Sequence, residues 1–357
     1  MPRPICALID SSALQHNLDI VRRRTAARIM AVIKANAYGH GLLPVARALN
    51  QADGFALLDV QDAVRLREAG FRQTILLLEG FFTPEDLLLC AEYDLACVIH
   101  SDAQVAMLDA YPRRHALQVW LKINTGMNRL GFLPTEFAAV NAHLTSHPAV
   151  RQVTLMTHFS HADEIAGVTN QLDCFSSLTE SVRQARSLAN SAAIVRFPLT
   201  HADWVRPGIM LYGASPFGFN PAFPSAQDLD LRPVMTLRSE ILSVQNIKAG
   251  DTVGYAGLFR ADKSMKIGIV ACGYADGYPR HAPTGTPVLV NGQRTRTVGR
   301  VSMDMLAVDL SGVVGANVGV RVTLWGQGLP VEEVAHAADT ISYELLCALA
   351  PRVPVIY

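Results

Sequence analysis

The stretch at residues 29–41, IMAVIKANAYGHG, joins an apolar run to a polar turn. Its first five residues are continuously apolar and partly β-branched, which is typical of a strand buried in a parallel sheet. Lys34 follows the strand at once, and the residues after it are small or turn-forming. A lysine at such a position often only reaches into solvent. Here its ammonium would lie over a cavity, so Lys34 is a candidate for chemistry.

Runs of the same kind alternate with amphipathic helical patterns between residues 12 and 215. The strand-like runs are 29–33, 54–58, 74–80, 95–100, 117–124, 152–158, a weaker one at 186–192, and 207–213. The helical patterns include 60–70, 83–93, 101–111 and 135–146, and several open with a capping side chain followed by an acid. Eight alternating units predict an α/β fold with a TIM-type (β/α)8 barrel, and a doubly wound sheet is the alternative.

The pattern changes after the Pro-, Gly- and Ser-rich segment 215–233. Strand-length runs follow at 234–247, 266–274, 286–301, 304–311 and 317–326, and Asn291-Gly292 is a hairpin signal. The stretch 331–349 has a helical pattern. We therefore predict a barrel domain at 1–224 and a second, mostly β domain at 225–357.

Composition excludes several classes of protein. The chain has 357 residues, is 50% hydrophobic, and carries 31 basic and 31 acidic residues, so no basic surface for nucleic acid or membranes is expected. The six cysteines show no C-x-x-C spacing and no cluster with histidine, which predicts buried thiols in a reducing compartment and no metal site. A charged residue, Asp10, precedes any signal-length apolar run, and no run has membrane-spanning length. A cytoplasmic location is expected.

Polar residues follow the predicted strands, where barrel chemistry is found. They are Lys34, the segment 124–129, His158, Asn190 and Ser191. Arg206 directly precedes the predicted eighth strand. A purely structural barrel would not need this alignment at one rim.

Nine motifs then occur in an order that resembles bacterial alanine racemases. They are VIKANAYGHG, KINTGMNRLGF, MTHFS, ANSAA, WVRPGIMLYG, VGYAG, GYADGYPR, GRVSMDM and ISYELL, and they cover essentially the whole chain. Each motif alone would be weak evidence, but the ordered series is specific. The family consists of homodimeric enzymes that use pyridoxal 5′-phosphate (PLP) and combine a barrel with a β domain.

The resemblance implies interconversion of L-alanine and D-alanine through an external aldimine of PLP. Lys34 would form the Schiff base with PLP and act as one base at Cα. Tyr255, in VGYAG, would be the opposing base and would reach into the site of a partner subunit. A phenol is a weak base, so it needs a proton-sharing neighbour, and His158 fits that role.

The resemblance also assigns cofactor contacts. The phosphate would be bound by the Ser191 hydroxyl beside Asn190, by the amides of Gly208 and Ile209, and by the hydroxyls of Tyr38 and Tyr343. Alone, Ser191 would be a helix cap and Tyr343 a buried core tyrosine.

Arg206 would face the pyridine nitrogen. Because a guanidinium only donates hydrogen bonds, that nitrogen would stay unprotonated, and the ring would be a weaker electron sink. Many family members have a histidine supporting this arginine where this chain has Ser187. A serine is not expected to make the same hydrogen bond, so either the tuning of Arg206 differs or His201 or Asp203 supports it instead. A surface salt bridge is the alternative role of Arg206.

The remaining assignments concern the substrate. Arg129 would contact the PLP oxygen and the substrate carboxylate, and Lys122 would be carbamylated, which gives Arg129 an anionic partner. An ordinary strand lysine is the alternative. The Met303 amide would bind the substrate carboxylate, and Tyr274 would narrow the entrance in favour of a methyl side chain.

Three other functions remain open from sequence. A PLP-dependent racemase of a larger amino acid or a barrel-type decarboxylase would need a larger pocket, and the decarboxylase would need a carboxylate in place of Arg206. A non-catalytic PLP carrier would resemble the first domain only, whereas this chain has the β domain with Tyr255 and Met303.

Overall fold

The computed structural model describes residues 3–111 and 115–357, and its chain forms two compact units. The barrel unit comprises Asn17–Ala37 and Gly41–Leu211. The β unit comprises the N-terminal segment up to His16, the short segment Tyr38–His40, and Tyr212–Tyr357.

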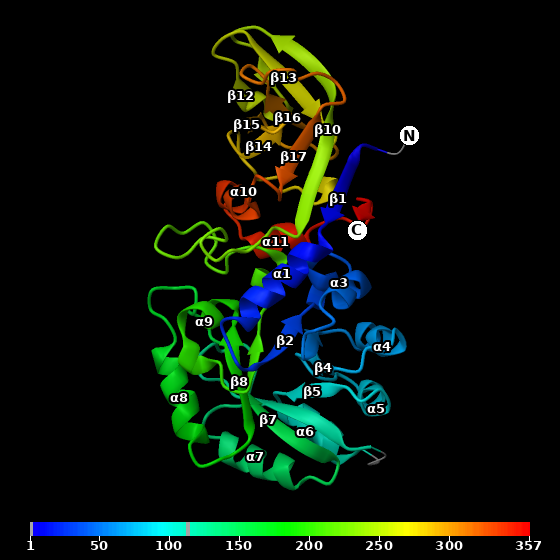
Figure 1. Cartoon of the computed structure of the whole chain (residues 1–357), viewed down its shortest axis with the longest axis vertical. Helices are drawn as coiled ribbons and strands as arrows, with labels where there is room; N and C mark the ends of the chain where they lie inside the picture. The colour runs from blue at the N-terminus through cyan, green and yellow to red at the C-terminus, as the bar shows by residue number, and fades with distance from the viewer. Residues whose placement is uncertain (1–2, 112–114) are drawn as a thin grey trace. The chain divides into compact units, whose positions relative to one another are not determined.

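Eight parallel strands close the barrel (Figure 1). They are β2 (Arg28–Val32), β3 (Gly54–Leu57), β4 (Thr74–Leu77), β5 (Ala96–Ile99), β6 (Leu117–Lys122), β7 (Val150–Met156), β8 (Ala185–Asn190) and β9 (Trp204–Arg206). Most strand residues are buried, because the barrel interior covers one face and helices cover the other. The predicted (β/α)8 barrel is confirmed.

Helix α1 (Ser11–Arg22) precedes the first barrel strand in the chain, and the other helices of this part of the chain lie between consecutive barrel strands. They are α3 (Leu42–Ala48), α4 (Val60–Glu68), α5 (Pro84–Glu92), α6 (Asp102–Asp109), α7 (Phe137–Ser146), α8 (Thr169–Thr179) and α9 (Ser191–Arg196), with a 3-10 turn η1 (Pro198–Thr200). Thr83 and Asp86 form a capping box at the start of α5, as the sequence pattern predicted. No helix in the described ranges is long and apolar enough to cross a membrane.

The eighth barrel strand differs from the prediction. The run at 207–213 is not a strand, because its centre forms the 3-10 turn η2 (Ile209–Tyr212). The strand is the three residues before it, β9, which pairs with β2 and β8. Pro207 lacks an amide proton and cannot continue a ladder, so the strand ends at Arg206. Arg206 is therefore the last residue of the eighth strand and does not precede it.

The β unit is built around a closed ring of strands. The long β10 (Met235–Ile247) pairs with both β13 (Met265–Val270) and β17 (Arg321–Trp325), and β14 (Pro287–Val290), β15 (Gln293–Val298) and β16 (Leu306–Asp309) complete the ring. Beyond it lie β1 (Ile5–Ile9) and β18 (Val355–Ile356), and β11 (Thr252–Val253) pairs with β12 (Phe259–Arg260). Asn291 and Gly292 both have positive φ in the β14–β15 hairpin, as their pairing predicted.

Two features depart from the sequence reading of the ends of the chain. The helical stretch 331–349 is two helices, α10 (Val331–Ala337) and α11 (Ser342–Cys347), separated by Asp339 with φ of 53°. The N-terminal strand β1 pairs antiparallel with β10, so this segment belongs to the β unit and not to the barrel. The observed units thus differ from a division at residue 224.

Candidate active site

Lys34 stands at the carboxyl end of β2 and opens a left-handed turn, α2 (Lys34–Tyr38). Ala35, Asn36 and Ala37 have φ values of 53°, 52° and 54°, a region that side chains with a Cβ rarely adopt. The Asn36 side-chain oxygen accepts the Leu42 amide at 2.9 Å, and its carbonyl accepts the Gly41 amide at 2.9 Å. These bonds hold the strained turn, and Lys34 itself is half-buried.

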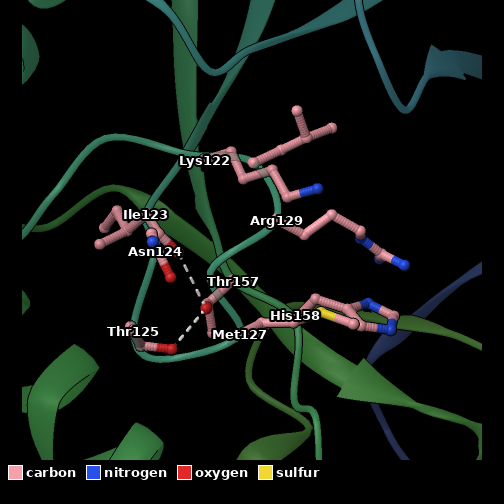
Figure 2. A pocket seen from close by; sticks show the side chains of 9 residues that line it. Lys122, Ile123, Asn124, Thr125, Met127, Arg129, Thr157 and His158 are labelled. Carbon is pink, nitrogen blue, oxygen red and sulfur yellow. Dashed lines mark hydrogen bonds between the residues drawn. The ribbon is translucent and has the colours of Figure 1, made fainter.

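A pocket lies at the ends of β6 and β7 and is lined by three of the predicted residues, Lys122, Arg129 and His158. Figure 2 shows their side chains extending to the same side of the pocket. Lys122 is the last residue of β6 and is 8% exposed, whereas Arg129 is exposed on the loop that follows. Of the polar residues predicted after strands, Arg129 and His158 thus lie at one pocket, together with Lys122 at the end of β6.

A buried network of hydrogen bonds joins the two loops of this pocket, and no sequence motif indicates these contacts. The hydroxyls of Thr125 and Thr157 are 2.7 Å apart, and the Thr157 hydroxyl donates to the Ile123 carbonyl at 3.0 Å (Figure 2). Gln171 on α8 donates to the Thr125 hydroxyl at 3.2 Å and to the His158 carbonyl at 3.1 Å. The network fixes the backbone that carries His158.

Positive charge gathers at this rim and shifts two pKa values. Burial, then Arg206 and Arg129, lower the pKa of Lys122 to about 8. Burial and the same two guanidinium groups hold the pKa of His158 well below its usual value. Lys34 acts on both groups in the same direction. His158 is therefore neutral near pH 7, and Lys122 is partly neutral.

Arg206 is 4% exposed and bound on several sides. Its Nη1 donates to the Ser187 hydroxyl at 2.5 Å, and its Nη2 donates to the carbonyls of Thr157 at 2.7 Å and Leu188 at 3.2 Å. Burial lowers its pKa to about 10, so it remains a cation at neutral pH. These contacts are with neutral acceptors, not with a surface carboxylate.

Ser187 supports Arg206 directly, which corrects the expectation that His201 or Asp203 would do so. Ser187 is fully buried, and its hydroxyl also donates to the Trp204 carbonyl at 2.9 Å. His201 instead contacts the Ile194 carbonyl, and Asp203 accepts the Arg186 amide. A short serine suffices because β8 and β9 are neighbouring strands.

The predicted phosphate ligands of the barrel unit also lie together. Asn190 caps α9 by accepting the Ala193 amide at 3.0 Å. The Ser191 hydroxyl accepts the Gly208 amide at 2.9 Å, so two of the proposed ligands meet at one point, and Ile209 follows directly. The Val32 amide donates to the Pro207 carbonyl at 3.0 Å, which places this turn beside the strand that leads to Lys34.

The β unit brings Tyr38 and Tyr343 together. Their ring centroids are 6.0 Å apart, and Tyr38 stacks on Tyr212 at 4.5 Å. Burial, followed by the neighbouring Tyr343, raises the pKa of Tyr38 well above its usual value, so its hydroxyl remains a hydrogen-bond donor. The two predicted tyrosines are thus neighbours in the β unit.

Tyr255, Tyr274 and Met303 are exposed on the β unit, by 70%, 38% and 53%. Tyr255 opens the 3-10 turn η3 (Tyr255–Gly257), which Gly254 precedes with positive φ and in which Ala256 also has positive φ. Tyr255, Tyr274 and Met303 lie in a different unit from Lys34.

One cluster outside this site has the composition of a metal site. Single ligand atoms of Asp109, His143 and His147 lie within 4.8 Å of one another. Nδ1 of His147 accepts the Ala149 amide at 3.2 Å, so in the neutral ring Nε2 carries the proton and faces Asp109 at 3.4 Å. His143 faces the same oxygen at 2.8 Å. Hydrogen bonding between the helix ends accounts for the cluster, and the prediction of no metal site stays a prediction.

Comparisons with known proteins agree with this arrangement in both units. The model of the alanine racemase N-terminal domain matches residues 9–216, and that of the C-terminal domain matches residues 234–357. The chain belongs to the alanine racemase family. An alanine racemase from Nitrosospira multiformis is 62% identical over 99% of both chains, and one from Nitrosomonas eutropha is 59% identical over 100% of this chain and 99% of its own.

Solved alanine racemases share the whole fold. The biosynthetic alanine racemase from Pseudomonas aeruginosa is 46% identical, covers 99% of both chains and has a TM-score of 0.96. The enzyme from Bacillus anthracis, solved with bound L-Ala-P, is 30% identical, covers 99% of this chain and 95% of its own, and has a TM-score of 0.86. Because the family match includes the β domain, it disfavours the PLP-carrier interpretation.

Proposed function

We propose that the protein is an alanine racemase that binds PLP on Lys34 and interconverts L-alanine and D-alanine. The observation that carries the proposal is the gathering of Lys34, Lys122, Arg129 and Arg206 at one rim of the barrel, each acting electrostatically on His158. Buried or crowded cations are unfavourable unless anions neutralise them. A cofactor phosphate, a ring oxygen and a substrate carboxylate are such anions.

The residues present fit PLP at several points. Ser191, the Gly208 amide, Tyr38 and Tyr343 would hold the phosphate, with Asn190 and Ile209 beside them. Lys34 would hold the cofactor through its ε-amine. Arg206 would face the ring nitrogen and, because it only donates, would keep that nitrogen unprotonated. PLP supplies one thing when bound, which is withdrawal of electrons from Cα of the amino acid attached to it.

The chain's own residues would then move the proton. Lys34 would exchange it on one face of Cα, and Tyr255 of the partner subunit on the other. Removal by one base and return by the other inverts the centre. His158 is neutral and can therefore share a proton with that tyrosine. Arg129 and the Met303 amide would bind the substrate carboxylate, and Tyr274 would limit the side chain to a methyl group.

Lys122 is proposed to react as the neutral amine with CO2, which forms an N–C bond and releases one N–H proton to solvent, so that the product is a carbamate anion. Carbamate formation needs the neutral amine, and a pKa of about 8 leaves about one lysine in ten neutral at pH 7. The product is an anion that would pair with Arg129 and reverse the repulsion that now acts on Lys122. This modification and the ion pair are part of the proposal.

The proposal includes a homodimer in the cytoplasm. The dimer is supported by the exposure of Tyr255, Tyr274 and Met303. The location is supported by the six cysteines, which are all free thiols.

The decisive experiment is incubation of the purified protein with D-alanine while optical rotation and CO2 are followed. We expect decay of rotation to zero without CO2 release, and the same end point from L-alanine. Release of CO2 would indicate a decarboxylase. Rotation that changes with a larger amino acid but not with alanine would indicate a different racemase, and no reaction with any amino acid would support the carrier.

A further inference from the structure

The carboxylate of Asp276, two residues after the exposed Tyr274, is fully buried in the β unit. It ends the 3-10 turn η4 (Tyr274–Asp276). Nη1 of Arg3 donates to both of its oxygens at 2.6 and 2.7 Å, Nε of Arg352 donates at 2.8 Å, and the Gly273 amide donates at 2.9 Å. The carboxylate is thus bound by two guanidinium groups and a backbone amide.

The same two arginines also bind the loop that carries Met303. Nη2 of Arg352 donates to the Asp304 carboxylate at 2.7 Å, and Nη2 of Arg3 donates to the Asp304 carbonyl. Arg3 and Arg352 come from opposite ends of the chain. Each arginine therefore bridges Asp276 and Asp304, and these hydrogen bonds join the loop that carries Tyr274 to the loop that carries Met303.

Backbone contacts transmit this arrangement to Tyr274 and Met303. The Tyr274 amide donates to the Ser302 carbonyl at 3.1 Å, and the Ala275 amide donates to the Met303 carbonyl at 3.0 Å. A Cβ on Gly273 would stand 2.3 Å from the Met303 carbonyl oxygen, so the loops leave no room for a side chain there. Small shifts of Asp276 must move Tyr274 and Met303 together.

We propose that Asp276 is a positioning residue that sets the substrate contacts made by Tyr274 and the Met303 amide. The inference rests on the proposed function, because that function gives these two residues their contact with alanine. Buried ion pairs contribute little net stability, because desolvation offsets their attraction. Four charged groups at this place are better explained by the fixed geometry that they give two binding loops.

The test is Asp276→Asn in the PLP-loaded enzyme. The amide keeps one oxygen as acceptor but turns two N–H donors toward Arg3 and Arg352, so the loops must shift. We expect KM for alanine to rise roughly tenfold while kcat changes less than about threefold, since displaced binding groups act mainly on substrate binding. The preference for alanine over serine should fall, and the visible absorbance of PLP on Lys34 should not change.

Asp309→Asn is the matched control, because Asp309 accepts from Arg296 at 3.4 Å in the same β unit. Its KM for alanine should equal that of the wild type. Equal KM and equal selectivity in Asp276→Asn would overturn the inference, as would the same change in the control. If wild-type protein does not racemise alanine, the proposed function fails instead, so the two failures are distinct.

Arg352→Gln keeps the test decisive if Asp276→Asn does not fold. It removes one guanidinium from both loops but leaves the carboxylate bound by Arg3 and Gly273. We expect a smaller increase in KM for alanine, in the same direction and with kcat again nearly constant. A change in kcat with constant KM would contradict positioning of the substrate.

Discussion

Lys34 is the residue on which the proposed chemistry depends. Replacing it with alanine removes the amine that would bind PLP covalently. We expect Lys34→Ala to lose visible absorbance after dialysis and to be inactive. Its Tm should be no lower than that of the wild-type protein without cofactor. Lys248→Ala, at an exposed lysine of the β unit, is the control and should keep both absorbance and activity. Unchanged bound absorbance in Lys34→Ala would refute the assignment.

Lys122 should make stability depend on pH. Between pH 8 and 10.5 its amine is protonated in the unfolded chain and neutral in the folded one. The unfolded state then binds more protons, so the free energy of unfolding rises with pH across this window. Below pH 8 the amine is charged in both states, and the folded state bears the full cost of burying that charge. In CO2-free buffer, apo Lys122→Met should be more stable than wild type at pH 7, by up to about 3 kcal/mol.

Urea unfolding at several pH values tests this expectation. The advantage of Lys122→Met should shrink as pH rises from 8 toward 10.5, while Lys248→Met should change stability by less than about 0.5 kcal/mol. A difference that is constant with pH would show that Lys122 is not held as a buried cation.

At this same scale, the sequence located residues by their position after strands. Lys34, His158 and Asn190 lie at or within two residues of the ends of β2, β7 and β8, and strand ends can be read from the hydrophobic pattern. Thr125 and Thr157 also lie near strand ends, but Gln171 lies on α8, and the hydrogen bonds that join these three side chains could not be found in this way. Their role arises from contacts between separate loops, and an isolated threonine or glutamine carries no periodic signal.

Among the elements, the left-handed turn after Lys34 should reverse the usual effect of replacing alanine with glycine, which is a loss of stability. Ala35 is exposed with φ of 53°, a conformation that costs about 1–2 kcal/mol for a residue with a Cβ. Ala35→Gly removes that cost. It also destabilises the folded state by about 0.5–1 kcal/mol, because glycine loses more backbone entropy on folding than alanine does. We expect a net stabilisation of about 0.5 kcal/mol.

The matched control is Ala139→Gly, an exposed alanine inside the ordinary helix α7. It should destabilise the protein by about 1 kcal/mol. Paired urea unfolding curves measure both values. If both substitutions destabilise equally, the turn is not strained at Ala35.

Element predictions succeeded where a local rule applied and failed where it did not. Asn291-Gly292 specifies its own turn, and Thr83 with Asp86 specifies a helix start. The three residues of β9 are too few to show a period, so the longer apolar run at 207–213 looked more like a strand. Its apolar residues are buried all the same, but in a 3-10 turn.

At the scale of the whole molecule, the barrel and the β unit were predictable, but the chain's division between them was not. β1 lies far in sequence from its partner β10, and local pattern carries no information on such pairing. The segment Tyr38–His40 likewise belongs to the β unit, although it follows a barrel strand. Long-range strand pairing and side-chain packing decide both cases.

Whether each active site is built from two chains can be tested by mixing subunits. If Lys34 meets Tyr255 only across a two-fold interface, homodimers of Lys34→Ala and of Tyr255→Ala each lack one base at both sites. A heterodimer has one site with both lesions and one with neither. With random assortment, half of the dimers are mixed and half of their sites are intact, so about a quarter of wild-type activity should return.

The two variants should be mixed under conditions in which subunits exchange, with exchange verified by differently tagged chains. Wild type mixed with Lys34→Ala is the control for loss of activity during handling. A site within one chain would carry a lesion in every arrangement, so exchange could restore nothing. Recovery near one quarter therefore requires that Tyr255 act in the partner's site, whereas verified exchange without recovery would place Tyr255 in its own chain or outside the reaction.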